Sequence, residues 1–210
     1  MSSGRSQRSG GARQVGKAIF RDAILDAAEA LFDERGVHAA RIQDIAGRAG
    51  VAVGTVYNHF EQKEDIVRAL MLRHLPVVAA LLAPRAEDPA DWAGSFRARM
   101  GRVHGYVAGH RHFFRMACEL GMLGPTAPRM AVDVVNPAHL IEEMIATGVA
   151  QGALAGDPVQ LTRFLFGAIR GLVEGALVTG SERLREEAAL AVDLFLRAVS
   201  QPRANDAAQL

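Results

Sequence analysis

Side chains that can bond anions cluster in one short stretch of the sequence. Tyr57, Asn58 and His59 stand in a row, and Lys63 follows them. A phenol, an amide, an imidazole and an ammonium group can each bond a phosphate oxygen, and an amide can also read the edge of a base. The other interpretation is that Tyr57 and His59 pack against a neighbouring helix. The residues around the row decide between the two.

The residues directly before this row are small. Val53, Gly54 and Thr55 would form the exposed first turn of a helix, and only Thr55 among them carries a polar group. A helix that enters the major groove of DNA, about 12 Å wide, needs such a bare turn because bulky or acidic side chains would clash with the groove or repel phosphate. The pattern predicts a recognition helix over residues 53–60, with Phe60 in the core.

The spacing around this helix is typical of a helix-turn-helix. Ala46 is small where two helices would cross, Gly50 follows at the turn, and the apolar Val56 comes after it. The turn needs a positive φ, which glycine adopts without strain. Ile45 and Val51, together with Val56, are expected in the shared core.

Residues 20–70 resemble the DNA-binding domain of the TetR family of bacterial transcriptional regulators. The most specific part of the resemblance is IA…AGV..GTVYNHF..K, and the rest of the chain is similar to the family's ligand-binding and dimerisation domain. The resemblance places the DNA contacts on Arg41, Gln43, Val53, Gly54, Thr55, Tyr57, Asn58, His59 and Lys63.

Two helix starts depart from the family's pattern. Ala40 and Ala52 stand where members often carry Thr or Ser, and the loss of a side-chain cap costs about 1 kcal/mol. The N-terminal segment offers a compensation, because residues 1–21 hold five basic side chains and no acid. A basic arm adds affinity for DNA by neutralising phosphates. A solvated tail without a partner is the other interpretation of this segment.

Helical periodicity recurs along the chain, and no stretch shows the sustained alternation of a β-strand. The chain is therefore predicted to be all-α. Helices are expected at about 20–35, 42–49, 53–60, 61–84 with an interruption or bend at Pro76, 90–108, 111–123, 129–152 with a split at Asn136–Pro137 as an alternative, 158–178 and 182–199. Asp88, Asp157 and Ser181 are the expected N-caps of three of them.

These elements predict four parts of the chain. A disordered basic arm at 1–17 precedes a three-helix, helix-turn-helix DNA-binding domain at 18–65. A larger helical ligand-binding and dimerisation domain spans 66–202, and a disordered tail follows at 203–210.

The resemblance implies a homodimer formed by the last two helices. Gly167, Gly171 and Gly175 recur at a spacing that lets helices approach closely, although burial within one subunit is the alternative for any single residue. The expected interface residues are Leu161, Leu165, Ala168, Leu172, Leu190, Leu194, Phe195 and Ala198.

The resemblance also implies that the remaining helices enclose a cavity for a largely apolar effector. The expected lining is Phe96, Met100, His104, Phe114, Cys118, Met122, Met144, Phe166 and Arg170, with Phe113 beside them. Methionine and aromatic side chains suit an adaptable apolar pocket, although each alone is more often plain core. Arg170 is expected to be buried and paired with Glu174 or with an anion on the ligand.

Several classes of protein are disfavoured by the sequence. The lone cysteine, Cys118, excludes an internal disulfide and fits a cytoplasmic protein, and no apolar run is long enough for a membrane span. His104, His110, His112 and His139 lack the spacing of a strong metal site, so neither a metal nor another cofactor is expected. No motif of a catalytic nucleophile is present, which argues against an enzyme.

The sequence thus predicts a homodimeric one-component transcriptional regulator. The expected form is a repressor that leaves a pseudo-palindromic operator on double-stranded DNA when a small molecule binds the larger domain. A small-molecule binder or helical enzyme with a vestigial DNA domain is a second hypothesis. A regulator of the same fold that activates transcription, or that answers to a protein partner, is a third.

Overall fold

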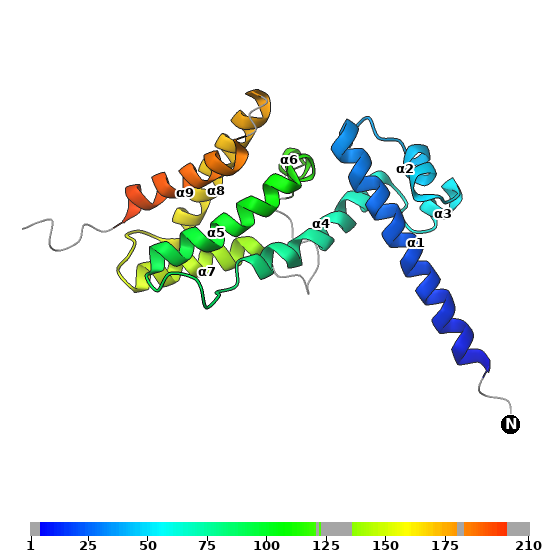
Figure 1. Cartoon of the computed structure of the whole chain (residues 1–210), viewed down its shortest axis with the longest axis horizontal. Helices are drawn as coiled ribbons and strands as arrows, with labels where there is room; N and C mark the ends of the chain where they lie inside the picture. Colours follow the sequence, from blue (N-terminus) through cyan, green and yellow to red (C-terminus); the bar gives the residue numbers. More distant parts are fainter. Residues whose placement is uncertain (1–4, 121, 123–135, 180–182, 201–210) are drawn as a thin grey trace, which may run out of the picture. The chain divides into compact units, whose positions relative to one another are not determined.

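The computed structural model describes residues 5–120, 122, 136–179 and 183–200, with the side chains of 5–14, 118–119, 173–174 and 176–179 left out. Within the described ranges the regular structure is helical (Figure 1). One isolated β-bridge joins Leu154 and Ser200. The predicted all-α class is confirmed. The predicted cap Ser181 lies outside the described residues.

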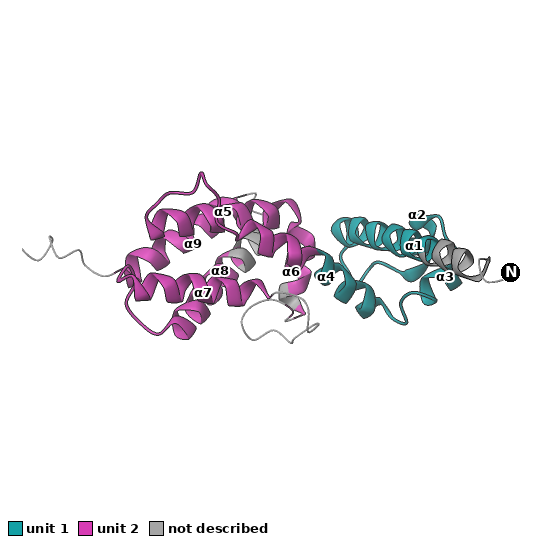
Figure 2. Cartoon of the chain, turned by 90° about the horizontal axis from the view of Figure 1, so that it is seen from below, with its two compact units in different colours: residues 1–73 teal, residues 74–210 magenta. Residues whose placement is uncertain are grey.

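The chain forms two compact units, unit 1 over Met1–Arg73 and unit 2 over His74–Leu210 (Figure 2). The division falls inside α4 (Lys63–Leu81), a helix that runs without interruption through the exposed Pro76. The predicted interruption at this proline is therefore wrong. The sequence placed the division near the start of this helix, at residues 65 and 66.

Unit 1 contains α1 (Arg5–Arg35), α2 (Ile42–Ala49), α3 (Val53–Tyr57) and the first part of α4. Helix α1 packs against α2, and α2 against α3. Residues 5–17 belong to α1, whereas the sequence predicted a disordered arm at 1–17. Serine and glycine disfavour a helix on their own, but a helix already nucleated by packed residues extends at little cost per residue.

The described residues of unit 2 form, after the end of α4, the helices α5 (Trp92–Gly109), α6 (Arg111–Glu119), α7 (Pro137–Ala150), α8 (Pro158–Thr179) and α9 (Leu184–Val199). Helix α5 packs against α6, α7 and α9, and α8 packs against α7 and α9. Helix α7 begins at the Asn136–Pro137 pair, where the Asn136 side chain accepts the N–H of Ala138.

Trp92, a half-buried residue at the start of α5, connects α5 with α7 and, through Phe96, with α9. Its indole stacks on Phe96 at a centroid distance of 5.0 Å, and Phe96 in turn lies 6.3 Å from the ring of Phe195. The indole N–H donates to the carbonyl of Met144 at 2.9 Å. Gly148 leaves room for the indole, since a Cβ there would come within 2.5 Å of it.

The cap of α5 is Asp91, which accepts the Gly94 N–H, and the expectation of Asp88 is wrong. Asp88 instead forms an ion pair with Arg102, which holds the pKa of its carboxyl at about 2. Arg102 also donates to the carbonyls of Leu81 and Ala83 at 3.0 and 2.9 Å. These bonds satisfy carbonyls that the end of α4 leaves without helical partners. Asp157 caps α8 as predicted, by accepting the Gln160 N–H.

Candidate functional site

The turn between α2 and α3 has the predicted helix-turn-helix geometry. Gly50 adopts φ 66°, and its N–H points to the carbonyls of Ala46 and Gly47. The Val51 N–H donates to the carbonyl of Ala46 at 3.0 Å. Ala46 is buried, and so are Ile45 and Val56. The positive φ at the turn and the burial of these three side chains are confirmed, while Val51 is half-buried.

One face of α3 presents its small turn to solvent. Gly54 is exposed, and a Cβ built there would have no atom within 4 Å. Tyr57 is 51% exposed and Asn58 is exposed, whereas Val53 and Thr55 are half-buried. Arg41 and Gln43, at the start of α2, are exposed as well.

Both short helices of the motif start without a side-chain cap. Ala52 is the N-cap of α3 and forms no capping bond, as its methyl side chain requires. The N-cap of α2 is Arg41, one residue after the expected Ala40, and its side chain does not cap either. Ala40 is buried. The beginning of α3 therefore keeps N–H groups that a capping hydroxyl would otherwise bond.

Lys63 has a structural role that sequence reasoning missed. Its ammonium group donates to the carbonyls of His38 at 3.4 Å and of Ala40 at 3.2 Å. These contacts fasten the loop before α2 to the start of α4. A lysine has three donors, so this anchoring leaves one hydrogen for a phosphate.

Basic residues of α1 lie close to the polar row after α3. The pKa of His59 is lowered by burial and by the positive charges of Lys17 and Arg21. The Arg21 guanidinium also lies 5.4 Å above the ring of Phe60. The last basic side chains of the segment 1–21 therefore join the surface that carries Tyr57 and Asn58. The spacing of the sequence alone did not show this proximity.

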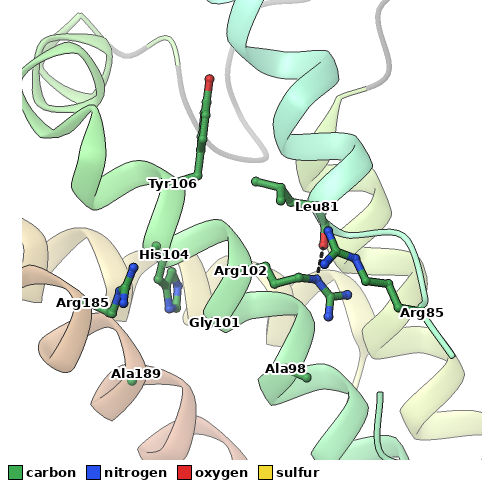
Figure 3. A pocket seen from close by; sticks show the side chains of 10 residues that line it. Leu81, Arg85, Ala98, Gly101, Arg102, His104, Tyr106, Arg185 and Ala189 are labelled. Carbon is green, nitrogen blue, oxygen red and sulfur yellow. Dashed lines mark hydrogen bonds between the residues drawn. The ribbon is translucent and has the colours of Figure 1, made fainter. Parts of the chain in front are cut away.

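Unit 2 carries an open groove of about 680 Å³ over α5 (Figure 3). Its floor is made of small residues of α5, and its walls come from the end of α4 and from α9. The lining residues are Leu81, Arg85, Ala98, Gly101, Arg102, His104, Gly105, Tyr106, Arg185 and Ala189.

The charged side chains that line this groove are all arginines. Arg102 is engaged with Asp88 and with backbone carbonyls, and Arg85 lies 3.7 Å from Glu87. Arg185 makes no ion pair or hydrogen bond with any described residue. Its guanidinium lies directly over Gly105, where a Cβ would meet a guanidinium nitrogen at 2.8 Å.

His104 lines the same groove and lacks polar partners. It is only 5% exposed, and neither ring nitrogen has a hydrogen-bond partner among the described residues. Burial lowers the pKa of its imidazole to about 4. The ring is therefore neutral near pH 7 and can donate one hydrogen bond and accept another.

The other predicted ligand residues are placed differently. Phe96, Met100, Phe114 and Met144 are buried side chains of the unit 2 core, and Phe113 is buried with them. Phe166 and Met122 are half-buried, and the side chain of Cys118 lies outside the described part. Arg170 is exposed, so its expected burial is wrong. Its position on α8 turns it outward, a direction that helical periodicity alone did not fix.

His74 of α4, a histidine that sequence reasoning missed, contacts side chains of α5 and α6. His74 is buried, and its Nδ1 lies 2.7 Å from the hydroxyl of Tyr106. The imidazole stacks on Phe113 at 4.2 Å and lies 5.0 Å from the ring of His110. The available signal was helical spacing, because His74 lies four residues after the buried Leu70 and four before the buried Val78.

The predicted dimer residues fall into two groups. Leu161, Leu165 and Phe195 are buried inside unit 2, so they are not available to a partner. Ala168 and Leu172 are half-buried, whereas Leu190, Leu194 and Ala198 are exposed. Phe164, not predicted, is 56% exposed. Gly167, Gly171 and Gly175 face open space, because a Cβ at any of them would have no atom within 4 Å.

Residues 24–70 match the model of the bacterial regulatory proteins of the tetR family. The HTH-type transcriptional repressor KstR2 of Rhodococcus jostii is 43% identical over 56 residues, which are 27% of this chain and only 28% of KstR2. The HTH-type transcriptional repressor Rv3405c of Mycobacterium tuberculosis is 44% identical over 167 residues, which cover 70% of this chain and 87% of Rv3405c.

A solved structure extends the likeness beyond residues 24–70. SmeT, the repressor of the Stenotrophomonas maltophilia multidrug efflux pump SmeDEF, aligns with a TM-score of 0.62 at 26% identity. The alignment covers 86% of this chain and 90% of SmeT. A second SmeT structure is a complex with triclosan. Separately, no helix in the described ranges is long and apolar enough to cross a membrane.

Proposed function

Because the chain belongs to the TetR family of bacterial regulatory proteins, we propose that it is a homodimeric repressor that releases its operator when a small molecule binds unit 2. The family is one of transcriptional regulators rather than enzymes. The observation that carries the proposal is the bare, solvent-facing turn of α3 beside the exposed Tyr57.

In unit 1, α3 enters the major groove with Gly54 and Thr55 leading. Tyr57 and Asn58, both exposed, then meet the phosphate wall and the base edges. Arg41 and Gln43 at the start of α2 contact phosphate. His59 and Lys63 contribute at the edge of this surface, and Lys63 mainly holds the loop before α2.

Two copies of the chain read the operator together. Successive half-sites of a palindrome lie about 34 Å apart, so the dimer must hold two reading heads at that spacing. The proposed dimer surface consists of Phe164, the glycines 167, 171 and 175, Leu190 and Leu194. Large apolar side chains exposed beside open glycines allow helices of a second copy to approach closely and bury them.

In unit 2, a small molecule shifts the balance between DNA-binding and released states. SmeT, which is similar along most of its length, has been solved with triclosan, and this supports a small-molecule effector here. A coupling of about 1–3 kcal/mol between ligand and operator is ordinary for such a switch.

The DNA assignment is tested on an operator selected from random duplex DNA by the purified chain. Tyr57→Ala should weaken operator binding about tenfold, because a bond to phosphate and its packing on the backbone are lost. Tyr57→Phe is the matched control that removes the hydroxyl alone. Operator affinity unchanged by Tyr57→Ala, with the melting temperature intact, would remove Tyr57 from the interface.

The dimer assignment is tested by sedimentation of the full chain. Leu194→Glu should shift the chain from dimer to monomer, because two acids would be buried without partners. Leu120→Glu is the control, since Leu120 is also exposed, at 44%, but lies on neither α8 nor α9. A dimer that survives the first substitution as well as the second contradicts this surface.

A further inference from the structure

We propose that the groove over α5 is the effector site and that it takes an organic anion, a carboxylate on an apolar body. This inference rests on the proposed function, which supplies the need for an effector, and it names the class of molecule. It differs from the sequence expectation of a buried apolar cavity, because the predicted lining residues Phe96, Met100, Phe114 and Met144 pack in the core.

The size and floor of the groove suit a small molecule. Its volume of about 680 Å³ lies within the range of about 300–1,000 Å³ that ligand sites occupy. Ala98, Gly101 and Gly105 form a floor without bulk, and a Cβ at Gly101 would have no atom within 4 Å. Leu81 and Ala189 add apolar surface on opposite walls, so a hydrocarbon or aromatic body can lie along α5 (Figure 3).

The charge of the groove selects the sign of the ligand. Arg85, Arg102 and Arg185 line it, and no carboxylate does. Arg102 already holds Asp88, but Arg185 has no described partner. A guanidinium binds a carboxylate through two parallel hydrogen bonds. Arg185 lies over Gly105, which places the anionic end of the ligand at the α9 side of the groove.

His104 supplies the second polar contact. Its ring is nine-tenths buried, lines the groove and leaves both nitrogens unbonded among the described residues. A buried polar group without a partner destabilises the folded chain, so its retention points to a bonding partner outside the described residues. The neutral imidazole can donate to a carboxylate oxygen. His104 directly precedes Gly105, over which the Arg185 guanidinium lies.

The test is calorimetric titration of the full chain, without DNA, against matched probes. Decanoate and benzoate are the anions, decanol and benzyl alcohol the neutral partners, and decylammonium the cation. At least one carboxylate should bind, its alcohol about tenfold more weakly, and the cation not at all. Equal binding of carboxylate and alcohol, or no binding of either carboxylate, overturns the inference.

Two substitutions locate the site. Arg185→Gln should weaken carboxylate binding about tenfold and leave alcohol binding unchanged. Arg111→Gln is the control, because Arg111 is an exposed cation on α6 outside the groove. Gly101→Leu should abolish binding by filling the floor, and the open space at Gly101 together with leucine's better helix propensity should keep the chain folded. Wild-type affinity in either groove variant overturns the inference.

Operator binding, measured separately on the same preparations, distinguishes this inference from the proposed function. A chain that binds its operator but no carboxylate contradicts only the ligand class and site. A chain that binds carboxylate at the groove but no operator contradicts the repressor proposal and leaves the groove assignment intact.

Discussion

Tyr57 in unit 1 and His104 in unit 2 are both proposed to bond a ligand, yet their surroundings differ. Tyr57 is 51% exposed and stays hydrated until DNA displaces the water. His104 is 5% exposed, and both its ring nitrogens are buried without a hydrogen-bond partner among the described residues. The proposed DNA surface therefore lowers the stability of the free chain little. The buried, unbonded His104 in the groove lowers that stability even when no ligand is bound. Substitutions of exposed residues on the proposed DNA surface, such as Tyr57, should change operator affinity alone, and those at His104 should change stability too.

Gly54→Glu carries the largest expected effect. In the proposed complex the acid would meet phosphate inside the major groove of DNA. Because the proposed dimer presents two reading heads, a cost of about 2 kcal/mol each would lower operator affinity about 1,000-fold. The open space at Gly54 and the favourable place of an acid at a helix start should leave the melting temperature unchanged. Fluorescence anisotropy with labelled operator measures the loss.

Gly54→Ala is the matched control, since it adds a methyl group without charge. A melting temperature that falls with Gly54→Glu would break the contrast between the two sites, because the DNA surface would then also be coupled to folding. Carboxylate binding to unit 2 should be the same in all three chains.

The next effect is a loss of stability in acid caused by His104. Its pKa is about 4 in the folded chain against an ordinary value of 6.5, so between these values the unfolded chain binds more protons. The titration of His104 therefore does not reduce the stability of the folded chain above pH 6.5, and it reduces that stability increasingly as pH drops towards 4. The loss reaches about 3 kcal/mol at pH 4, since each tenfold in proton affinity is worth about 1.4 kcal/mol.

His104→Leu separates this contribution from that of the other titrating groups. The variant should be more stable than the parent chain at neutral pH, and the gap should widen as pH falls from 6.5 to 4. Urea denaturation at a series of pH values gives both quantities. A gap that stays constant with pH would mean that His104 is already bonded within the chain.

The smallest effect concerns the uncapped start of α3. Ala52→Ser places a hydroxyl at an N-cap whose φ of −69° and ψ of 148° suit capping, and should stabilise the chain by about 1 kcal/mol. Ala39→Ser, in an exposed turn, is the control with the same chemical change. Chemical denaturation of both variants measures the difference. No gain at position 52 would show that another group already bonds these N–H groups.

The helix-turn-helix could be predicted from the sequence because its requirements are local. The positive φ of Gly50 and the burial of Ala46 and Val56 follow from contacts between residues close in the chain. The exposure of Tyr57 and Asn58 after the small turn of α3 follows from the same local pattern. The roles of Lys63 and Arg21 were not, because their contacts involve residues distant in sequence.

In unit 2 the sequence predicted the helices but not what each face contacts. Helical periodicity marks Leu165 and Leu194 alike as apolar, yet Leu165 packs in the core and Leu194 is exposed. Arg170 was expected to be buried but is exposed, because helical periodicity does not tell which face of α8 is covered. The groove could not be anticipated, because it depends on which residues of α4 and α9 flank the glycines of α5.

The indole of Trp92 gives this molecule a built-in optical reporter. It is the single tryptophan of the sequence, and it lies in unit 2, stacked on Phe96 and bonded to the carbonyl of Met144. Its fluorescence emission therefore depends on the contact between α5 and α7. Unit 1 has no tryptophan and contributes no indole emission. Comparing this signal with far-ultraviolet circular dichroism, which sees every helix, would tell whether the two units melt together or one after the other.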